Sequence, residues 1–206
     1  MFSFKKDIYK SRVGCLDCVA HDVTIDTQIW AGCNLDVSTY LNGDPIPEVT
    51  DPTIWATLTT GAWCYYNNDP IHGTIYGKLY NWYAVNDPRG LAPVGYHVPS
   101  DTEWTTLTSF LGGTAIAGGA MKEAGFCHWA TPNVGATNTS LFTALPGGFR
   151  EFLGTYRDIG NVSYLWSSTA SNINDAWARY LNQSAGAIYR QSPNKGCGLS
   201  VRLIKD

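Results

Sequence analysis

Pro99-Ser100-Asp101-Thr102-Glu103-Trp104 is the stretch that decides the fold, because it carries the signals of a helix start. In a capping box, a serine hydroxyl accepts a hydrogen bond from the amide three residues later, and a glutamate there reaches back to the serine's own amide. We therefore expect Ser100 and Glu103 to cap a helix that runs until Gly112-Gly113. Helical spacing places three apolar residues on its buried face: Trp104, Leu107 and Leu111.

Three further phrases flank this one in order along the chain: GKLYNWYAV (77–85), FTALPGGFR (142–150) and GLSVRLIKD (198–206). With HVPSDTEW (97–104) they resemble one family, the one named for the Fibrobacter succinogenes major paralogous domain. That family is similar to the formylglycine-generating-enzyme branch of the C-type lectin fold. Four ordered motifs are far more specific than any one of them.

The resemblance implies the fold class and the domain boundaries. We expect an α+β, C-type-lectin-like fold over residues 22–206, with short twisted antiparallel strands, two main short helices and long ordered loops. Residues 1–21 precede the resemblance and carry their own charge together with Cys15 and Cys18. We expect this segment to be an attachment or oligomerisation arm.

The amino-acid composition limits the classes of partner that the protein is expected to bind. At 206 residues the chain suits one large domain better than two small ones. Its net charge of −3 and the lack of a basic run argue against a nucleic-acid partner. Only 15% of the residues are charged, so the surface is expected to be made largely of Asn, Thr, Ser and Gly. Neither a secretory signal nor a membrane span is apparent, which leaves retention in the cell or export by a signal-free route such as assembly into a virus particle.

Local patterns predict the other elements. Alternation over 22–30 indicates one half-buried strand, and WCYY (63–66) indicates a second. Asp51-Pro52 predicts a brief helix that ends by Gly61, while 76–85 favours a helix that ends at Asp87-Pro88. The stretch 112–148 is rich in loop residues, and three aromatic residues are expected to fix it: Phe126, Trp129 and Phe142.

Cysteines and histidines give no clear metal or catalytic pattern. Cys15 and Cys18 form a CxxC without a second pair, so we favour mostly reduced thiols for these and for Cys33, Cys64, Cys127 and Cys197. His97 and His128 lack metal-like spacing and are expected to be hydrogen-bonded structural residues. A structural calcium ion is possible and is not predicted, because the Pro-flanked Glu/Asn pair and the Trp-Asn-Asp phrase of sugar-binding C-type lectins are missing. Asn174-Asp175 near Trp177 matches the Trp-Asn-Asp phrase only in part.

The segment 160–195 carries the functional hypothesis. Four large apolar residues are expected to be fixed core positions among small polar ones: Trp166, Trp177, Leu181 and Ile188. Rigid strands with changeable side chains between them suit a recognition surface. Ordinary solvated turns are the alternative that composition alone leaves open.

The resemblance favours recognition. Variable proteins of diversity-generating retroelements mutate the corresponding segment of a C-type lectin fold. The matching positions here are Ser163, Leu165, Asn172, Asn174, Ala178, Tyr180, Asn182, Gln183, Ser184, Ala185, Ala187, Tyr189, Gln191 and Ser192. In these retroelements the mutations occur at adenines, and an Asn codon that keeps its last base cannot become a Gln codon in this way. Gln183 and Gln191 therefore argue against direct diversification of this chain. A fixed binding site of the same shape is compatible with both residues. We expect these positions except Ala185, together with Tyr164, to bind the ligand.

Tyr164, Tyr180 and Tyr189 are the expected aromatic anchors. Arg179 and Arg190 either bind the ligand or pair with an inner carboxylate, and we favour the structural role. Formylglycine-generating enzymes use two cysteines near the end of the fold, whereas this tail has only Cys197. Asp101 and Glu103 are explained by the helix cap rather than by acid–base catalysis. We therefore expect no enzymatic activity and no cofactor.

Three hypotheses of function follow. The first is a phage virion adhesin or receptor-binding protein, such as a tail-fibre component, that binds a host surface protein or glycan through the 160–195 face. In this hypothesis the arm contacts other virion proteins, and the protein forms a homo-oligomer without membrane insertion. The second is a structural virion or surface-coat decoration protein without ligand capture. The third is an inactive relative of the formylglycine-generating enzymes.

Overall fold

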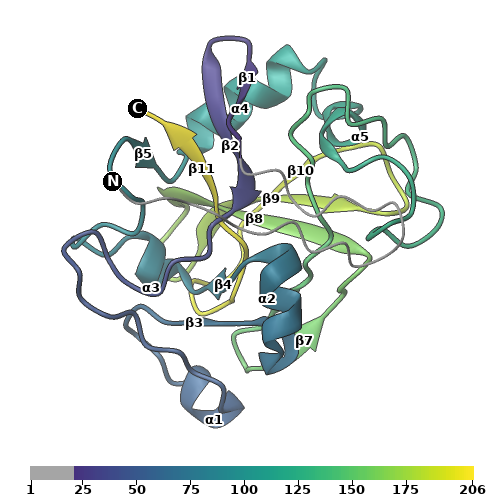
Figure 1. The fold of residues 1–206 in the computed structure, drawn as a ribbon. Coiled ribbons are helices and arrows are strands. Elements are labelled where there is room, and N and C mark those ends of the chain that lie inside the picture. Colours follow the sequence, from purple (N-terminus) through teal and green to yellow (C-terminus); the bar gives the residue numbers. More distant parts are fainter. Residues whose placement is uncertain (1–20) are drawn as a thin grey trace.

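Two antiparallel sheets form the centre of the protein in a computed structural model that describes residues 21–206 (Figure 1). One sheet has the strand order β1-β2-β11-β5 and the other has the order β10-β9-β8. Two short pairs, β3-β4 and β6-β7, lie outside these sheets. Helices and strands are mixed along the chain, so the fold is α+β. The expected arm, with Cys15 and Cys18, lies outside the described residues except for His21.

The strands are β1 (Val23–Ile25), β2 (Gln28–Asn34), β3 (Trp63–Cys64), β4 (Leu79–Tyr80), β5 (Tyr96–His97), β6 (Phe149–Arg150), β7 (Tyr156–Arg157), β8 (Val162–Ala170), β9 (Ala176–Asn182), β10 (Tyr189–Gln191) and β11 (Arg202–Lys205). The helices are α1 (Pro52–Trp55), α2 (Pro70–Tyr76), α3 (Trp82–Val85), α4 (Asp101–Phe110) and α5 (Ala117–Met121), with a 3-10 turn η1 (Tyr66–Asn68). None of these helices is long and apolar enough to cross a membrane.

Helix α4 begins as the sequence predicts. The Ser100 hydroxyl accepts a hydrogen bond from the Glu103 amide at 3.3 Å, and Glu103 Oε2 accepts one from the Ser100 amide at 2.7 Å. Both bonds of the capping box are therefore present. Trp104 and Leu107 are fully buried on the inner face of the helix. Trp104 packs with Trp30 of β2 at a ring-centroid distance of 4.7 Å, which joins the helix to the first sheet.

The strand predicted over 22–30 is wrong in its extent. Asp26 has a φ of 55°, and the chain turns there into a hairpin of β1 and β2 in which Val23 pairs with Trp30. The apolar alternation continues across the turn, because both arms of the hairpin place apolar side chains on the same core. β2 then pairs with β11, so the first described strand pair meets the last strand of the chain.

The helix predicted over 76–85 is also wrong. Helix α2 ends at Gly77, whose φ of 73° is a left-handed conformation that suits glycine. After Lys78, residues 79 and 80 form β4, and Asn81 then caps α3 by accepting a hydrogen bond from the Ala84 amide. WCYY is a strand only over 63–64 before the chain enters η1. The Asp51 cap of α1 is confirmed, and that helix ends at Trp55.

Aromatic residues and long-range hydrogen bonds fix the loop-rich stretch 112–148. Trp129 and Phe142 are buried as expected, and Trp129 Nε1 donates to the Ala144 carbonyl at 2.9 Å. Phe126 is 59% exposed and does not contribute, which corrects that expectation. A short helix, α5, lies within the stretch that the sequence indicates to be loop.

Three buried cations bind main-chain carbonyl groups, some in strands and the others in irregular segments. Arg202 of β11 donates to the carbonyls of residues 31, 32, 142 and 143 and to the Asn34 side chain. Arg150 of β6 donates to the carbonyls of residues 49, 50 and 154 and stacks on Trp55. Lys122 donates to the carbonyls of residues 134, 182 and 185, each at 2.9 Å. These side chains hold together loops that are far apart in sequence.

The thiols differ from the expectation of mostly reduced cysteines. Cys33 and Cys127 are disulfide-bonded, so that expectation is wrong for both. Cys64 and Cys197 are free and buried, as expected. Spacing alone does not identify the oxidised pairs, because disulfide connectivity depends on residues brought together by the fold.

His97 and His128 are structural residues, as predicted. His128 Nδ1 lies 2.8 Å from Glu123 Oε1. His97 lies between two carboxylates, with Nδ1 2.7 Å from Asp206 Oδ1 and Nε2 2.8 Å from Glu103 Oε1. Burial alone would lower the pKa of His97, but the hydrogen bonds to Glu103 and Asp206 outweigh it and raise the pKa above 6.5.

We expect Arg202→Met to lower the free energy of unfolding by about 3 kcal/mol or more, because buried carbonyl groups lose a charged donor. Urea denaturation followed by tryptophan fluorescence measures the change. Lys205→Met is the matched control in the same strand, with a side chain that is 47% exposed, and its effect is expected to stay within about 0.5 kcal/mol. Equal effects of the two substitutions would contradict the role of Arg202.

We expect the stability contributed by His97 to be lost as pH rises through its raised pKa. A group whose pKa is raised by folding stabilises the fold fully below its unfolded pKa of 6.5, and this contribution declines above that pH until it is lost once pH has passed the folded pKa. The difference in urea midpoint between the natural protein and His97→Gln should therefore shrink from about pH 6 to about pH 8.5. Taking the difference cancels the titration of other groups. A difference that grows with pH would be the wrong sign.

Candidate functional site

A row of tyrosines crosses the three-stranded sheet. Tyr164 of β8 pairs in register with Tyr180 of β9, which pairs with Tyr189 of β10. Side chains directly opposite one another on neighbouring strands lie on the same face of a sheet. The ring centroids of Tyr164 and Tyr180 are 5.2 Å apart, and those of Tyr180 and Tyr189 are 6.0 Å apart. The three anchors expected from sequence therefore form one continuous row.

The row extends onto a second strand pair. Phe149 of β6 meets the Tyr164 ring edge-to-face at 5.5 Å. At the same end, the Tyr164 hydroxyl donates to Gln191 Oε1 at 3.2 Å. Exposure increases along the row, from 7% for Tyr164 through the half-buried Tyr180 to 40% for Tyr189. The inner rings are fixed by packing while the outer ones face solvent.

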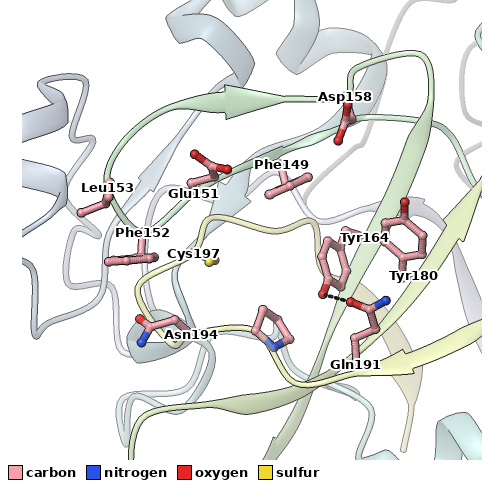
Figure 2. Close-up of a pocket in the computed structure, with 11 residues that line it drawn as sticks. Phe149, Glu151, Phe152, Leu153, Asp158, Tyr164, Tyr180, Gln191, Asn194 and Cys197 are labelled. Carbon is pink, nitrogen blue, oxygen red and sulfur yellow. Dashed lines mark hydrogen bonds between the residues drawn. The ribbon is translucent and has the colours of Figure 1, made fainter.

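An open groove of about 610 Å³ runs beside this row (Figure 2). Its lining residues are Phe149, Glu151, Phe152, Leu153, Asp158, Tyr164, Tyr180, Gln191, Pro193, Asn194 and Cys197. Figure 2 shows Glu151 and Asp158 on one side of the groove, with Gln191 and Asn194 on the other. The floor is aromatic and the walls carry carboxylate and amide groups, a combination that suits specific binding of a small group.

A second hollow of about 340 Å³ adjoins the groove. It is lined by Asp158, Asn161, Val162, Tyr180, Asn182, Gln183 and Ser184. Asp158 and Tyr180 belong to both linings, so they stand at the boundary between the two spaces. Ser184 donates through both its amide and its hydroxyl to Asn182 Oδ1, at 3.0 Å each. The polar residues predicted at 182–184 therefore lie next to the tyrosine row.

Lys122 positions this second hollow. Its ammonium group is fully buried and donates to the carbonyls of Asn182 and Ala185 from below, and to that of Val134 from the loop opposite. Burial lowers the pKa of Lys122 to about 8, so the group is mostly charged at neutral pH and keeps three donors. The irregular segment after β9 is thus fixed by a side chain from a distant part of the chain.

Three predicted ligand-binding residues are not on the surface. Ser163, Leu165 and Ala178 are 2% exposed or less. β8 is an edge strand of its sheet, but its alternate residues pack into different core clusters, with Tyr164 and Trp166 in one and Leu165 in the other. A two-residue period predicts one solvated face, whereas here both faces of β8 are covered. These three positions do not belong to the candidate surface.

Besides Tyr189, which extends the tyrosine row and lines neither hollow, four other predicted residues lie outside both. Asn172 and Asn174 occupy the turn between β8 and β9, where Asn172 Oδ1 accepts hydrogen bonds from the amides of Asn174 and Asp175. The Ser192 hydroxyl contacts the Ser171 hydroxyl across this end of the sheet. The Ala187 backbone packs closely against Gly118 of α5. These contacts explain the residues through local structure.

Asp101 binds the opposite face of the sheet, where Arg179 and Arg190 pair next to Tyr180 and Tyr189. Its carboxylate accepts a hydrogen bond from Arg179 Nη1 at 2.7 Å and from Arg190 Nη2 at 2.9 Å. Arg190 also stacks over the half-buried Trp177 ring, with 3.2 Å between the guanidinium carbon and the ring centroid. Both arginines therefore pair with an inner carboxylate, which confirms the structural role favoured from sequence. Trp166, Leu181 and Ile188 are buried as expected, whereas Trp177, which was also expected to be a core position, is only half-buried.

Eight groove residues were not identified from the sequence: Phe149, Glu151, Phe152, Leu153, Asp158, Pro193, Asn194 and Cys197. The β6–β7 hairpin and the segment before β11 bring them to the tyrosine row. The one signal within the sequence is Phe152-Leu153, an apolar pair between short polar stretches. Its two side chains are 46% and 61% exposed.

Burial shifts the pKa of three titratable groups that line the groove. Burial raises the pKa of the Cys197 thiol to about 11, so the thiol is protonated and unreactive at neutral pH. Burial also raises the pKa of Tyr164 and, with a smaller contribution from the charge of Asp158, that of Tyr180. Within residues 21–206, no cluster of three or more His, Cys, Asp or Glu side chains is arranged to hold a metal ion.

The structure thus defines a mixed α+β domain with an open, tyrosine-lined groove. Its chain belongs to the Fibrobacter succinogenes major domain family, whose model matches residues 23–205. This match confirms the resemblance carried by the four sequence phrases. Neither the curated proteins nor the solved structures that were searched gave a match.

We expect the two arginines that share Asp101 to differ sharply in their effect on stability. The Arg179 side chain is 3% exposed and that of Arg190 is 44% exposed. Arg179→Met should lower the free energy of unfolding by about 3 kcal/mol, because it leaves a carboxylate without its buried partner. Arg190→Met should cost less than about 1 kcal/mol, since exposed ion pairs are screened by water. Chemical denaturation of both variants provides the comparison, and similar losses would refute this assignment.

Proposed function

We propose that the protein is a non-enzymatic recognition module, an adhesin or receptor-binding protein displayed on a phage virion or another extracellular surface. It binds a host surface protein or glycan through the face formed by residues 160–195 and the β6–β7 hairpin. The observation that carries this proposal is the row of Tyr164, Tyr180 and Tyr189, of which the first two line an open groove. Tyrosine supplies large, rigid contact area at low cost in conformational entropy.

Two further observations support display outside the cell and the lack of catalysis. Cys33 and Cys127 are disulfide-bonded, and disulfides persist mainly in oxidising environments. The one thiol of the groove, Cys197, is protonated at neutral pH because burial raises its pKa to about 11. A nucleophilic cysteine needs the opposite shift.

The finer class and the assembly belong to the same proposal. The pairing of β2 with β11 and the long loops fixed by buried side chains are consistent with a C-type-lectin-like arrangement. In this proposal, residues 1–21 attach the domain to other virion proteins, and a homo-oligomer presents several grooves at once. Several weak sites acting together hold a cell far longer than one site does.

The test combines Tyr180→Ala with Tyr189→Ala and measures binding of fluorescently labelled, multivalently displayed protein to host cells. We expect cell binding to fall at least about tenfold, because aromatic anchors carry a large share of interface energy. Tyr83→Ala is the matched control, since Tyr83 is also half-buried and does not line the groove.

Near-ultraviolet circular dichroism confirms that each variant remains folded. Tyr189→Ala alone provides a second readout, because Tyr189 is exposed and its loss leaves the core intact. Undiminished cell binding by folded variants would refute the site. Absence of cell binding by the natural protein would instead favour the decoration protein without ligand capture.

A further inference from the structure

The groove and the adjoining hollow share one electrostatic character. Their linings contain the carboxylates of Glu151 and Asp158, whereas none of the described lining residues is Lys, Arg or His. The remaining polar groups are amides and hydroxyls. A concave surface with charges of one sign concentrates ligands of the opposite sign. The site therefore favours a cationic group and disfavours an anionic one.

The two carboxylates are not equivalent. Glu151 Oε1 accepts a hydrogen bond from Arg157 Nε at 3.1 Å, so its charge is already compensated. The Asp158 side chain has no ion pair within residues 21–206 and is exposed at the boundary of the two spaces. The Asp158 carbonyl accepts hydrogen bonds from the amides of residues 161 and 162, which fixes the backbone that carries this carboxylate.

An aromatic ring lies beside the uncompensated carboxylate. Figure 2 shows the Asp158 carboxylate directed into the groove on the side of Tyr180 and Phe149. Tyr180 is half-buried and held from behind by Tyr164, so its position is fixed before any ligand arrives. A cation between a carboxylate and a tyrosine ring gains both an ion pair and a cation–π contact.

The other end of the groove is apolar. Phe152 and Leu153 lie at the tip of the β6–β7 hairpin, where the amide of Gly154 donates to the Glu151 carbonyl at 2.9 Å. Their side chains are 46% and 61% exposed and line the same groove as Asp158. Exposed apolar side chains next to a polar site are typical of protein interfaces rather than of sites for free ions.

We infer that the groove binds a Lys or Arg side chain of a partner protein. The ammonium or guanidinium group lies at Asp158 beside Tyr180, and a neighbouring apolar side chain of the same partner packs on Phe152 and Leu153. This inference rests on the proposed function and specifies the chemistry of its ligand. Phosphorylated, sulfated or sialylated surfaces are excluded from the groove by the same carboxylates.

The test uses two capped dipeptides that differ only in charge, acetyl-Leu-Arg-amide and acetyl-Leu-citrulline-amide. Binding is followed by NMR shifts of the Tyr164, Tyr180 and Gln191 resonances. We expect saturable shifts with the arginine peptide and at least about fivefold weaker binding of the citrulline peptide. Raising the salt concentration should narrow this difference, because Asp158 is exposed.

Asp158→Asn is the decisive variant. Asp158 has a φ of 61°, a left-handed conformation that Asn also adopts readily, so the substitution removes the charge and keeps the backbone. The arginine peptide should then bind no better than the citrulline peptide. Glu151→Gln is the matched control and should weaken binding less than about twofold, since Arg157 already compensates Glu151.

The amino sugar methyl glucosaminide and the neutral methyl glucoside distinguish a protein partner from a glycan. Tighter binding of either sugar than of the arginine peptide would overturn the inference, as would equal binding of the two peptides or no effect of Asp158→Asn. None of these results bears on the Tyr180 and Tyr189 variants in the cell-binding test. Failure of the inference is therefore distinguishable from failure of the proposed function.

Discussion

Buried cations that bind main-chain carbonyl groups are the constraint on which the rest of the structure depends. Arg150, Lys122 and Arg202 are 1% exposed or less, and none has a carboxylate partner in the described part of the chain. Burying a charge is unfavourable unless hydrogen bonds satisfy it. Buried loops in turn carry carbonyl groups that need donors. Here the buried cations supply the donors that the loop carbonyl groups need, and the carbonyl groups supply the hydrogen bonds that the buried charges need. The long irregular segments thereby become fixed parts of the core.

This arrangement determines what the surface can do. Lys122 fixes the backbone at residues 182 and 185, and Arg150 fixes the turn at Gly154 that carries Phe152 and Leu153. The tyrosine row lies between these two points. Its side chains are therefore presented from a backbone that is ordered before a partner binds, which reduces the entropy lost on association. The irregular segments that line the groove are therefore held in place without being part of a regular strand.

Local sequence signals correctly predicted the features that local hydrogen bonds determine, namely the starts of two helices. The capping box at Ser100 and the Asp51 cap are local hydrogen bonds, and both were correct. The hairpin at Asp26 was missed because alternation continues across the turn. The sequence pattern did not distinguish helix α2 from strand β4, because a single left-handed glycine, Gly77, separates two apolar segments.

The candidate site was predictable in part. Tyr164, Tyr180 and Tyr189 were identified as aromatic anchors in the segment that the resemblance indicates, whereas Leu165 and Ala178 were included although a second layer of core covers them. Asp158 and the β6–β7 hairpin could not be found from sequence, since only tertiary contacts bring them to the row. Long-range contacts made by buried cations leave no periodic pattern in the amino-acid sequence from which they could be predicted.

Amide hydrogen exchange of the natural protein, read by mass spectrometry, tests most directly whether the irregular segments are fixed before binding. The account predicts that residues 133–146 and 182–187 exchange on the slow timescale of strands β8 and β9, because the same core holds all of them. Exchange of these segments at the rate of an unprotected chain, while β8 and β9 stay protected, would contradict it.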